Sequence, residues 1–127
     1  MVAAKDQDGT VKTTPVIHYD KRARNTDIEH DRDSALYQIE TIRRNIRAMT
    51  PEVLSSPVQG AFMLSAEGTE FAFESTLSRE MAFAVHHCIH HNALVKVLLQ
   101  QHFPDVSLPQ QFGMAPSTLN FNMLETS

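Results

Sequence analysis

The chain has 127 residues, of which 42% are hydrophobic, and its formal charge is −4. This length supports one globular core, and the acidic balance argues against a nucleic-acid partner because phosphate binding needs a concentrated basic surface. A single cysteine, Cys88, excludes an internal disulfide. There is no apolar run of about 18 residues and no hydrophobic signal core at the N-terminus, so we expect no membrane partner and a cytoplasmic location.

The first part of the chain is expected to have little regular structure before a helix begins. Residues 1–24 are polar and contain Pro15, which predicts an extended or disordered arm. The remainder, residues 25–127, is expected to be one domain. Asp31 or Asp33 could cap its first helix. Apolar residues at steps of three and four give this helix one hydrophobic face, made of Leu36, Ile39, Ile42, Ile46 and Met49.

Two shorter elements are expected next. Thr50 can cap a new helical turn that has Pro51 at its first position. From Val58 to Thr76 the apolar residues follow a period of about two, and residues 65–68 have turn composition. This pattern predicts a β-hairpin.

A long helix follows the hairpin. Thr76 or Ser78 can cap it, and it is expected to run to about His102, before the Phe-Pro pair at 103–104. Its apolar residues point in most directions, so other elements must cover it on several sides. Residues 108–117 are expected to be irregular because they contain prolines and a glycine.

Four histidines lie within six positions of this long helix. The pairs His86 and His90, and His87 and His91, are each one turn apart, so each pair presents two imidazoles on one helix face. Imidazole is a common ligand of zinc, nickel and iron. The pattern therefore predicts half of a metal site, with hydrogen-bonded or surface histidines as the alternative.

Several strings in the chain carry a family resemblance. They are Leu-x-Arg-Glu at 77–80, His-His-x-Ile-His-His at 86–91, and Leu-Pro-x-x-Phe-Gly-x-Ala-Pro-Ser-Thr at 108–118, together with the Tyr-Asp-x-Arg segment from residue 19. Through them, nearly everything after about residue 17 resembles the DinB/YfiT-like superfamily. The resemblance covers the middle and the C-terminal half of those proteins.

This resemblance implies a four-helix bundle that holds a divalent metal, zinc or nickel, through three histidines. Two ligands correspond to His87 and His91, with His86 and His90 as second choices. The family's first helix and the third ligand have no counterpart here, and His18 lies far from the ligand position. We therefore expect a mainly α, incomplete four-helix bundle with a small β-hairpin before the last long helix. A homodimer or partner helices would cover the exposed apolar face.

The resemblance implies a metal-binding domain, a remnant of a transferase that uses a low-molecular-weight thiol or of a hydrolase. In an active relative the metal lowers the pKa of a bound thiol or water. Whether this chain is an enzyme stays open, and the alternative is a non-catalytic helical interaction or scaffold domain without metal. Glu80 lies roughly 10 Å along the helix from His87, too far to join one tetrahedral site. Cys88 is expected to be a small buried hydrophobe.

Overall fold

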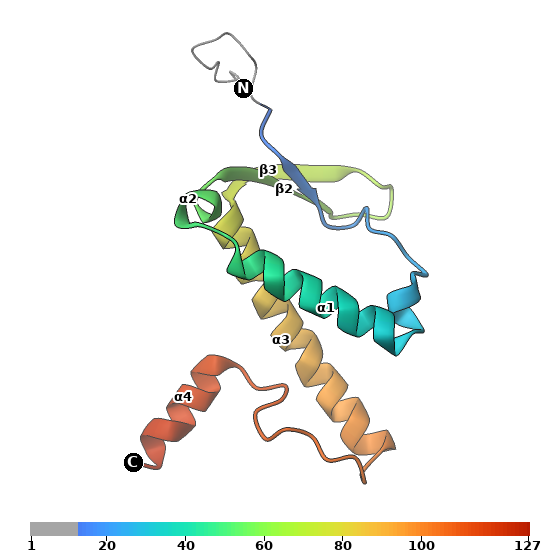
Figure 1. The fold of residues 1–127 in the computed structure, drawn as a ribbon, viewed down its shortest axis with the longest axis vertical. Coiled ribbons are helices and arrows are strands. Elements are labelled where there is room, and N and C mark those ends of the chain that lie inside the picture. Colours follow the sequence, from blue (N-terminus) through green and yellow to red (C-terminus); the bar gives the residue numbers. More distant parts are fainter. Residues whose placement is uncertain (1–12) are drawn as a thin grey trace. The chain divides into compact units, whose positions relative to one another are not determined.

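The computed structural model describes residues 13–127 of the chain (Figure 1). These residues fall into two compact units, one ending at Glu80 and the other running from Met81 to Ser127. The elements are, in chain order, β1 (Val16–His18), the 3-10 turn η1 (Asp27–Glu29), α1 (Arg32–Arg47), α2 (Pro51–Leu54), β2 (Pro57–Met63), β3 (Glu70–Thr76), α3 (Leu77–His102) and α4 (Pro116–Glu125).

A three-stranded mixed sheet organises the first unit. The strand order is β1-β2-β3, with β1 parallel and β3 antiparallel to the central strand β2. Among the described residues, the buried apolar positions are Val58 and Ala61, both on β2, with exposed fractions of 6% and 2%. The core of this unit therefore lies along the central strand.

The prediction of a mainly α helical bundle is wrong, because this mixed sheet organises the first unit. The predicted hairpin exists as β2 and β3. The sheet also contains β1, which lies in the polar stretch 1–24 that was expected to be an extended or disordered arm. Residues 1–12 of that stretch lie outside the described part. Asp20 fixes the end of β1, because its carboxylate accepts a hydrogen bond from the backbone N–H of Met63 at 2.7 Å.

The helix α1 begins where the capping pattern predicts. Asp31 caps it by accepting hydrogen bonds from the backbone N–H and the hydroxyl of Ser34, at 2.9 and 2.5 Å. These hydrogen bonds hold the pKa of Asp31 below its usual value. Four residues of the predicted hydrophobic face remain about half exposed, namely Leu36, Ile39, Ile42 and Ile46. The homodimer or partner helices predicted to cover the exposed apolar surface of the long helix α3 stay a prediction.

The next two helices also follow their sequence signals. Thr50 caps α2 by accepting a hydrogen bond from the backbone N–H of Val53 at 3.3 Å, with Pro51 in the first position. Thr76 accepts from the backbone N–H of Arg79 at 3.3 Å, at the start of α3. The predicted end of the long helix at His102 is confirmed.

The C-terminal tail contains a helix that was not predicted. Pro116 begins α4 at a position where its missing N–H would have no helical partner. The prediction of an irregular tail is therefore right only up to residue 115. Gly113 lies so close to α3 that a Cβ there would sit 3.0 Å from the carbonyl oxygen of Asn92 and 3.2 Å from the Cα of Ala93. A side chain at this position would have to push the backbone of α3 away, and the positive φ of 71° also favours glycine here.

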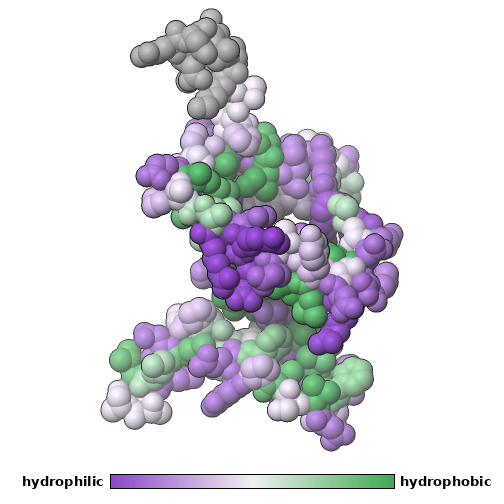
Figure 2. Space-filling model, viewed as in Figure 1, coloured by the Kyte–Doolittle hydropathy of each residue, from purple (hydrophilic) through white to green (hydrophobic). Residues whose placement is uncertain are grey.

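The surface of the described residues combines charged and apolar side chains (Figure 2). On the face drawn, strongly hydrophilic surface lies over α1, whose last turn carries Arg44 and Arg47. Large apolar side chains of α3 are also exposed, among them Val85, Val97 and Leu98. None of the described helices combines the length and the apolar character that crossing a membrane requires.

Candidate functional site

The two imidazoles singled out in the sequence face one another. The Nε2 atoms of His87 and His91 are 3.0 Å apart, and the ring centroids are 4.5 Å apart in an edge-on arrangement. Both side chains are exposed. The predicted spacing therefore brings two ring nitrogens together at the surface of α3.

The other histidines of the motif do not extend this pair into a larger ligand set. His86 and His90 are exposed, and the ring centroid of His90 lies 5.8 Å from that of His91. Within residues 13–127 no group of three or more histidine, cysteine, aspartate or glutamate side chains is placed to hold a metal ion. Cys88, expected to be a small buried hydrophobe, is exposed.

A different set of side chains gathers on one face of the sheet. Cross-strand pairing places Phe62 opposite Phe71 and Gly60 opposite Phe73, and paired residues point to the same face. Tyr19, just after β1, stacks on Phe62 with a centroid distance of 4.3 Å. We call this surface, made of Tyr19, Phe62, Phe71 and Phe73, the aromatic face.

The aromatic face has a fixed part and an exposed part. Phe62 stacks between Tyr19 and Phe73, since its centroid is also 5.8 Å from that of Phe73. Gly60 makes room for this arrangement, because a Cβ there would lie 2.8 Å from the ring of Phe73. Phe71 and Phe73 are nevertheless 52% and 41% exposed. Two phenylalanine rings are thus held by the sheet and still accessible.

A buried carboxylate borders the aromatic face. The side chain of Glu80, in the first turns of α3, is 2% exposed. Its Oε2 accepts a hydrogen bond from the Tyr19 hydroxyl at 2.5 Å, and its Oε1 accepts from Ser75 at 2.6 Å and from Arg79 at 3.3 Å. Burial raises the pKa of Glu80, but the hydrogen bonds from Ser75 and Tyr19 and the charge of Arg79 outweigh it, so the pKa is lowered overall. Glu80 is therefore a charged anchor for Tyr19.

The same contact affects the tyrosine. Burial, the hydrogen bond to Glu80 and the negative charge of Glu80 together raise the pKa of Tyr19 to about 12. A tyrosine whose pKa is raised on folding stabilises the fold below its ordinary pKa of 10.0 and loses this contribution as the pH rises towards 12.

We expect an absorbance titration of the folded protein to show this difference. The chain has two tyrosines, and one phenolate should appear only near pH 12. Tyr19→Phe should remove this late transition. If the late transition persists in Tyr19→Phe, or if the native protein shows no phenolate that appears only near pH 12, the contact between Tyr19 and Glu80 is absent in solution.

The opposite face of the sheet carries a smaller polar cluster. Glu70 accepts from Lys21 at 2.5 Å and lies 2.8 Å from Nδ1 of His18. The hydrogen bonds from Lys21 and His18 lower the pKa of Glu70. His18, which lies far from the ligand position that the resemblance implied, is thus a partner of a carboxylate.

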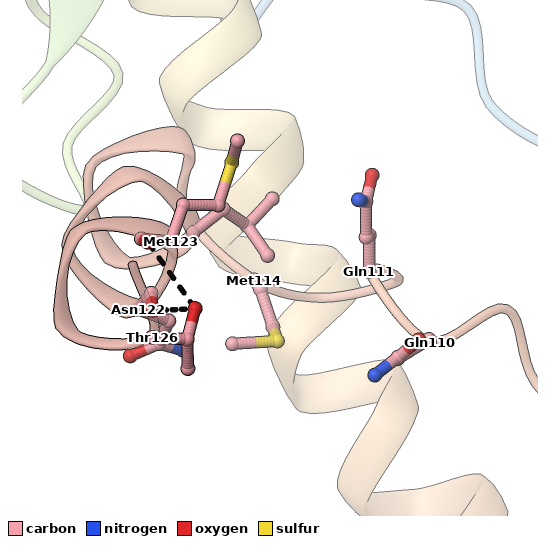
Figure 3. Close-up of a pocket in the computed structure, with 7 residues that line it drawn as sticks. Gln110, Gln111, Met114, Asn122, Met123 and Thr126 are labelled. Atoms are coloured by element: carbon pink, nitrogen blue, oxygen red, sulfur yellow. Dashed lines mark hydrogen bonds between the residues drawn. The ribbon is translucent and has the colours of Figure 1, made fainter.

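The second unit contains a hollow of about 310 Å³ (Figure 3). Gln110, Gln111 and Met114 line it from the loop before α4, and Asn122, Met123 and Thr126 line it from α4 and its end. The hydroxyl of Thr126 donates to the backbone carbonyls of Asn122 and Met123. No titratable side chain lines this hollow, so it offers no ionisable acid or base.

The comparisons with known proteins give one named relative. The chain is 35% identical over 105 residues to a protein of Rhizopus delemar named FK506-binding protein 5. The match covers 82% of this chain but 27% of the relative, so the chain spans about a quarter of the length of the curated relative that it matches. No family model matches the chain, and no solved structure matches it.

This relative corrects the identification made from the sequence. A protein named for binding FK506 does not agree with the DinB/YfiT-like resemblance, which is therefore wrong, as is the metal-binding function inferred from it. The expectation of a low-molecular-weight thiol loses the resemblance on which it rested, and the expectation of zinc or nickel keeps only the spacing of the histidines and stays a prediction. His87 and His91 remain a surface imidazole pair.

Part of the aromatic face could have been recognised in the sequence. Phe71 and Phe73 are two residues apart on a predicted strand, which places both on one face. No pattern in the sequence indicates that Tyr19 and Glu80 lie beside these rings, because the two residues are 61 positions apart in the chain and belong to separate elements.

Proposed function

We propose that the chain is a ligand-binding module that takes an apolar ligand on the aromatic face of its sheet. The observation that carries this proposal is the exposure of Phe71 and Phe73 beside a stacked pair of aromatic rings. Large apolar side chains that stay accessible on a sheet face commonly mark a binding surface.

The chemistry of the aromatic face indicates the kind of ligand. Flat rings offer a large apolar contact area with little loss of side-chain freedom on binding. The negative charge of Glu80 is buried and already accepts three hydrogen bonds, so it offers little to a cation. The side chain of Arg79, the residue before Glu80, is 61% exposed and carries several N–H donors. A mainly apolar ligand with a hydrogen-bond acceptor at one end fits this arrangement.

The relative supports the same class of function. Its name says that it binds FK506, and FK506 is therefore the first probe for this chain. The identity of 35% over 82% of the chain makes a related binding role the simplest proposal.

Calorimetric titration with FK506 tests the proposal. We expect saturable binding by the wild-type chain and a loss of about tenfold in affinity for Phe71→Ala and for Phe73→Ala, since tenfold corresponds to about 1.4 kcal/mol and one ring supplies about this much. The matched control is Tyr37→Ala, which removes a 71% exposed ring from α1 and should leave the affinity unchanged.

Two results would contradict the proposal. One is the absence of saturable binding by the folded wild-type chain. The other is binding that Phe71→Ala and Phe73→Ala leave unchanged, because the ligand would then sit elsewhere. Circular dichroism of each variant shows whether the sheet is intact.

A further inference from the structure

The strand β3 is an edge strand of the sheet that the described residues form. The sheet order β1-β2-β3 places β3 at one side, and no further strand pairs with it among residues 13–127. Natural edge strands are commonly protected by charged side chains, especially lysine, by proline or by a bulge. The charged residues of β3 are the glutamates Glu70 and Glu74. The seven residues of β3, Glu-Phe-Ala-Phe-Glu-Ser-Thr, contain neither proline nor lysine.

The hydrogen bonds of β2 show which backbone groups of β3 are open. Gln59 donates to the Pro15 carbonyl, and the Ala61 carbonyl accepts from Tyr19, so the backbone groups of these two β2 residues face β1. Backbone groups along a strand alternate in direction, so Gly60 and its neighbours at positions 58 and 62 face β3. The β3 residues paired with them, at positions 71, 73 and 75, therefore direct their backbone N–H and C=O groups towards β2.

The residues between these positions present their backbone groups outwards. They are Glu70, Ala72 and Glu74. An added strand would therefore bond to the backbone of Ala72 and Glu74. The residues of an added antiparallel strand that lie directly opposite Phe71 and Phe73 would form pairs without backbone hydrogen bonds. In such pairs the side chains of the two strands approach most closely.

The side chains of β3 set the pattern of such a strand. Phe71 and Phe73 lie on one face and favour apolar partners. Glu74 lies on the other face, is exposed, and favours a basic partner. Glu70 is already paired with Lys21 and His18, so Glu74 supplies most of the available negative charge.

We propose that the outer edge of β3 binds an extended peptide as a fourth strand, with apolar and basic side chains in alternation. Apolar side chains of the peptide lie on Phe71 and Phe73, and a basic side chain lies opposite Glu74. Backbone hydrogen bonds to Ala72 and Glu74 hold the peptide in register. This inference rests on the proposed function, because it names the class of ligand that the aromatic face takes.

The test uses a short peptide that alternates valine and lysine, titrated into the chain. A peptide that alternates valine and glutamate is the control for charge. The key variant is Ala72→Pro, which removes an outward N–H that has no partner in the sheet; proline is tolerated at such edge positions. We expect Ala72→Pro to keep the fold and to weaken binding of the valine-lysine peptide at least tenfold.

A second variant reverses the charge. Glu74→Lys should weaken the valine-lysine peptide about fivefold and strengthen the valine-glutamate peptide, as cross-strand pairs predict. Failure of the wild-type chain to bind the valine-lysine peptide would overturn the inference. Equal binding of both peptides, or binding that Ala72→Pro leaves unchanged, would overturn it as well.

The two proposals can fail separately. If FK506 binds and depends on Phe73 while the peptide does not bind, the aromatic face is a ligand site and the added strand is wrong. If the peptide binds in a manner that Ala72→Pro abolishes while FK506 does not bind, the peptide edge stands and the apolar-ligand site for FK506 is wrong.

Discussion

Replacing Glu80 by alanine is expected to lower the free energy of unfolding by about 2–4 kcal/mol, since it removes a buried charged acceptor and leaves its donors without a partner. The carboxylate is 2% exposed and accepts from Tyr19, Ser75 and Arg79. Without this carboxylate, the segment after β1 loses its hydrogen bond to the start of α3. Urea unfolding, followed by circular dichroism, measures the effect.

The matched control for this substitution is Glu74→Ala, which removes an exposed carboxylate from β3 and should change the stability by no more than about 0.5 kcal/mol. Glu80→Gln provides a second readout. Because the pKa of Glu80 is lowered on folding, its contribution is present above its ordinary pKa of 4.5 and is lost as the pH falls through the folded value. Below pH 4.5 the wild-type chain should lose stability more steeply than Glu80→Gln. Equal effects of Glu80→Ala and Glu74→Ala would show that the carboxylate is not buried in solution.

The other large effect is expected at the centre of the sheet. Ala61→Asp places a carboxylate without a partner at a position that is 2% exposed, and we expect a loss of about 4 kcal/mol or more, enough to unfold a marginally stable unit. Water molecules cannot reach this buried position to solvate the carboxylate of an aspartate. Far-ultraviolet circular dichroism and thermal unfolding measure the result.

Its control lies directly across the hairpin. Ala72 is the cross-strand partner of Ala61, on the same face of the sheet, and it is exposed. Ala72→Asp makes the same chemical change in water and should cost less than about 1 kcal/mol. Similar losses for the two variants would mean that β2 is not the central strand.

The sequence predicted the elements that have strong local signals. Asp31 capping α1, Thr50 with Pro51 starting α2, and the period-two pattern that becomes β2 and β3 are all interactions between residues close in the chain. Such signals can be recognised without knowledge of the fold. The long helix α3 also follows from its cap and its Phe-Pro end.

The features that the sequence did not predict depend mostly on contacts between residues far apart in the chain. The strand β1 has three residues, and its pairing with β2 joins Ile17 to Gly60 across more than forty residues. Tyr19 and Glu80 are further apart still. The helix α4 was missed because Pro116 was taken as a breaker rather than as a first helical residue.

The histidine motif shows the opposite problem, a strong local pattern that suggested the wrong function. The spacing correctly predicts that His87 and His91 share a helix face. It does not predict whether further ligands gather around them, because those would come from other elements.

Chemical-shift mapping of the amide groups during a titration with FK506 tests the central claim most directly. We expect saturable shifts that centre on β2 and β3, at Phe62, Phe71 and Phe73, and that become smaller in Phe73→Ala. Shifts confined to the hollow between residues 110 and 126, or none at saturating ligand, would contradict the claim that the aromatic face is the binding site.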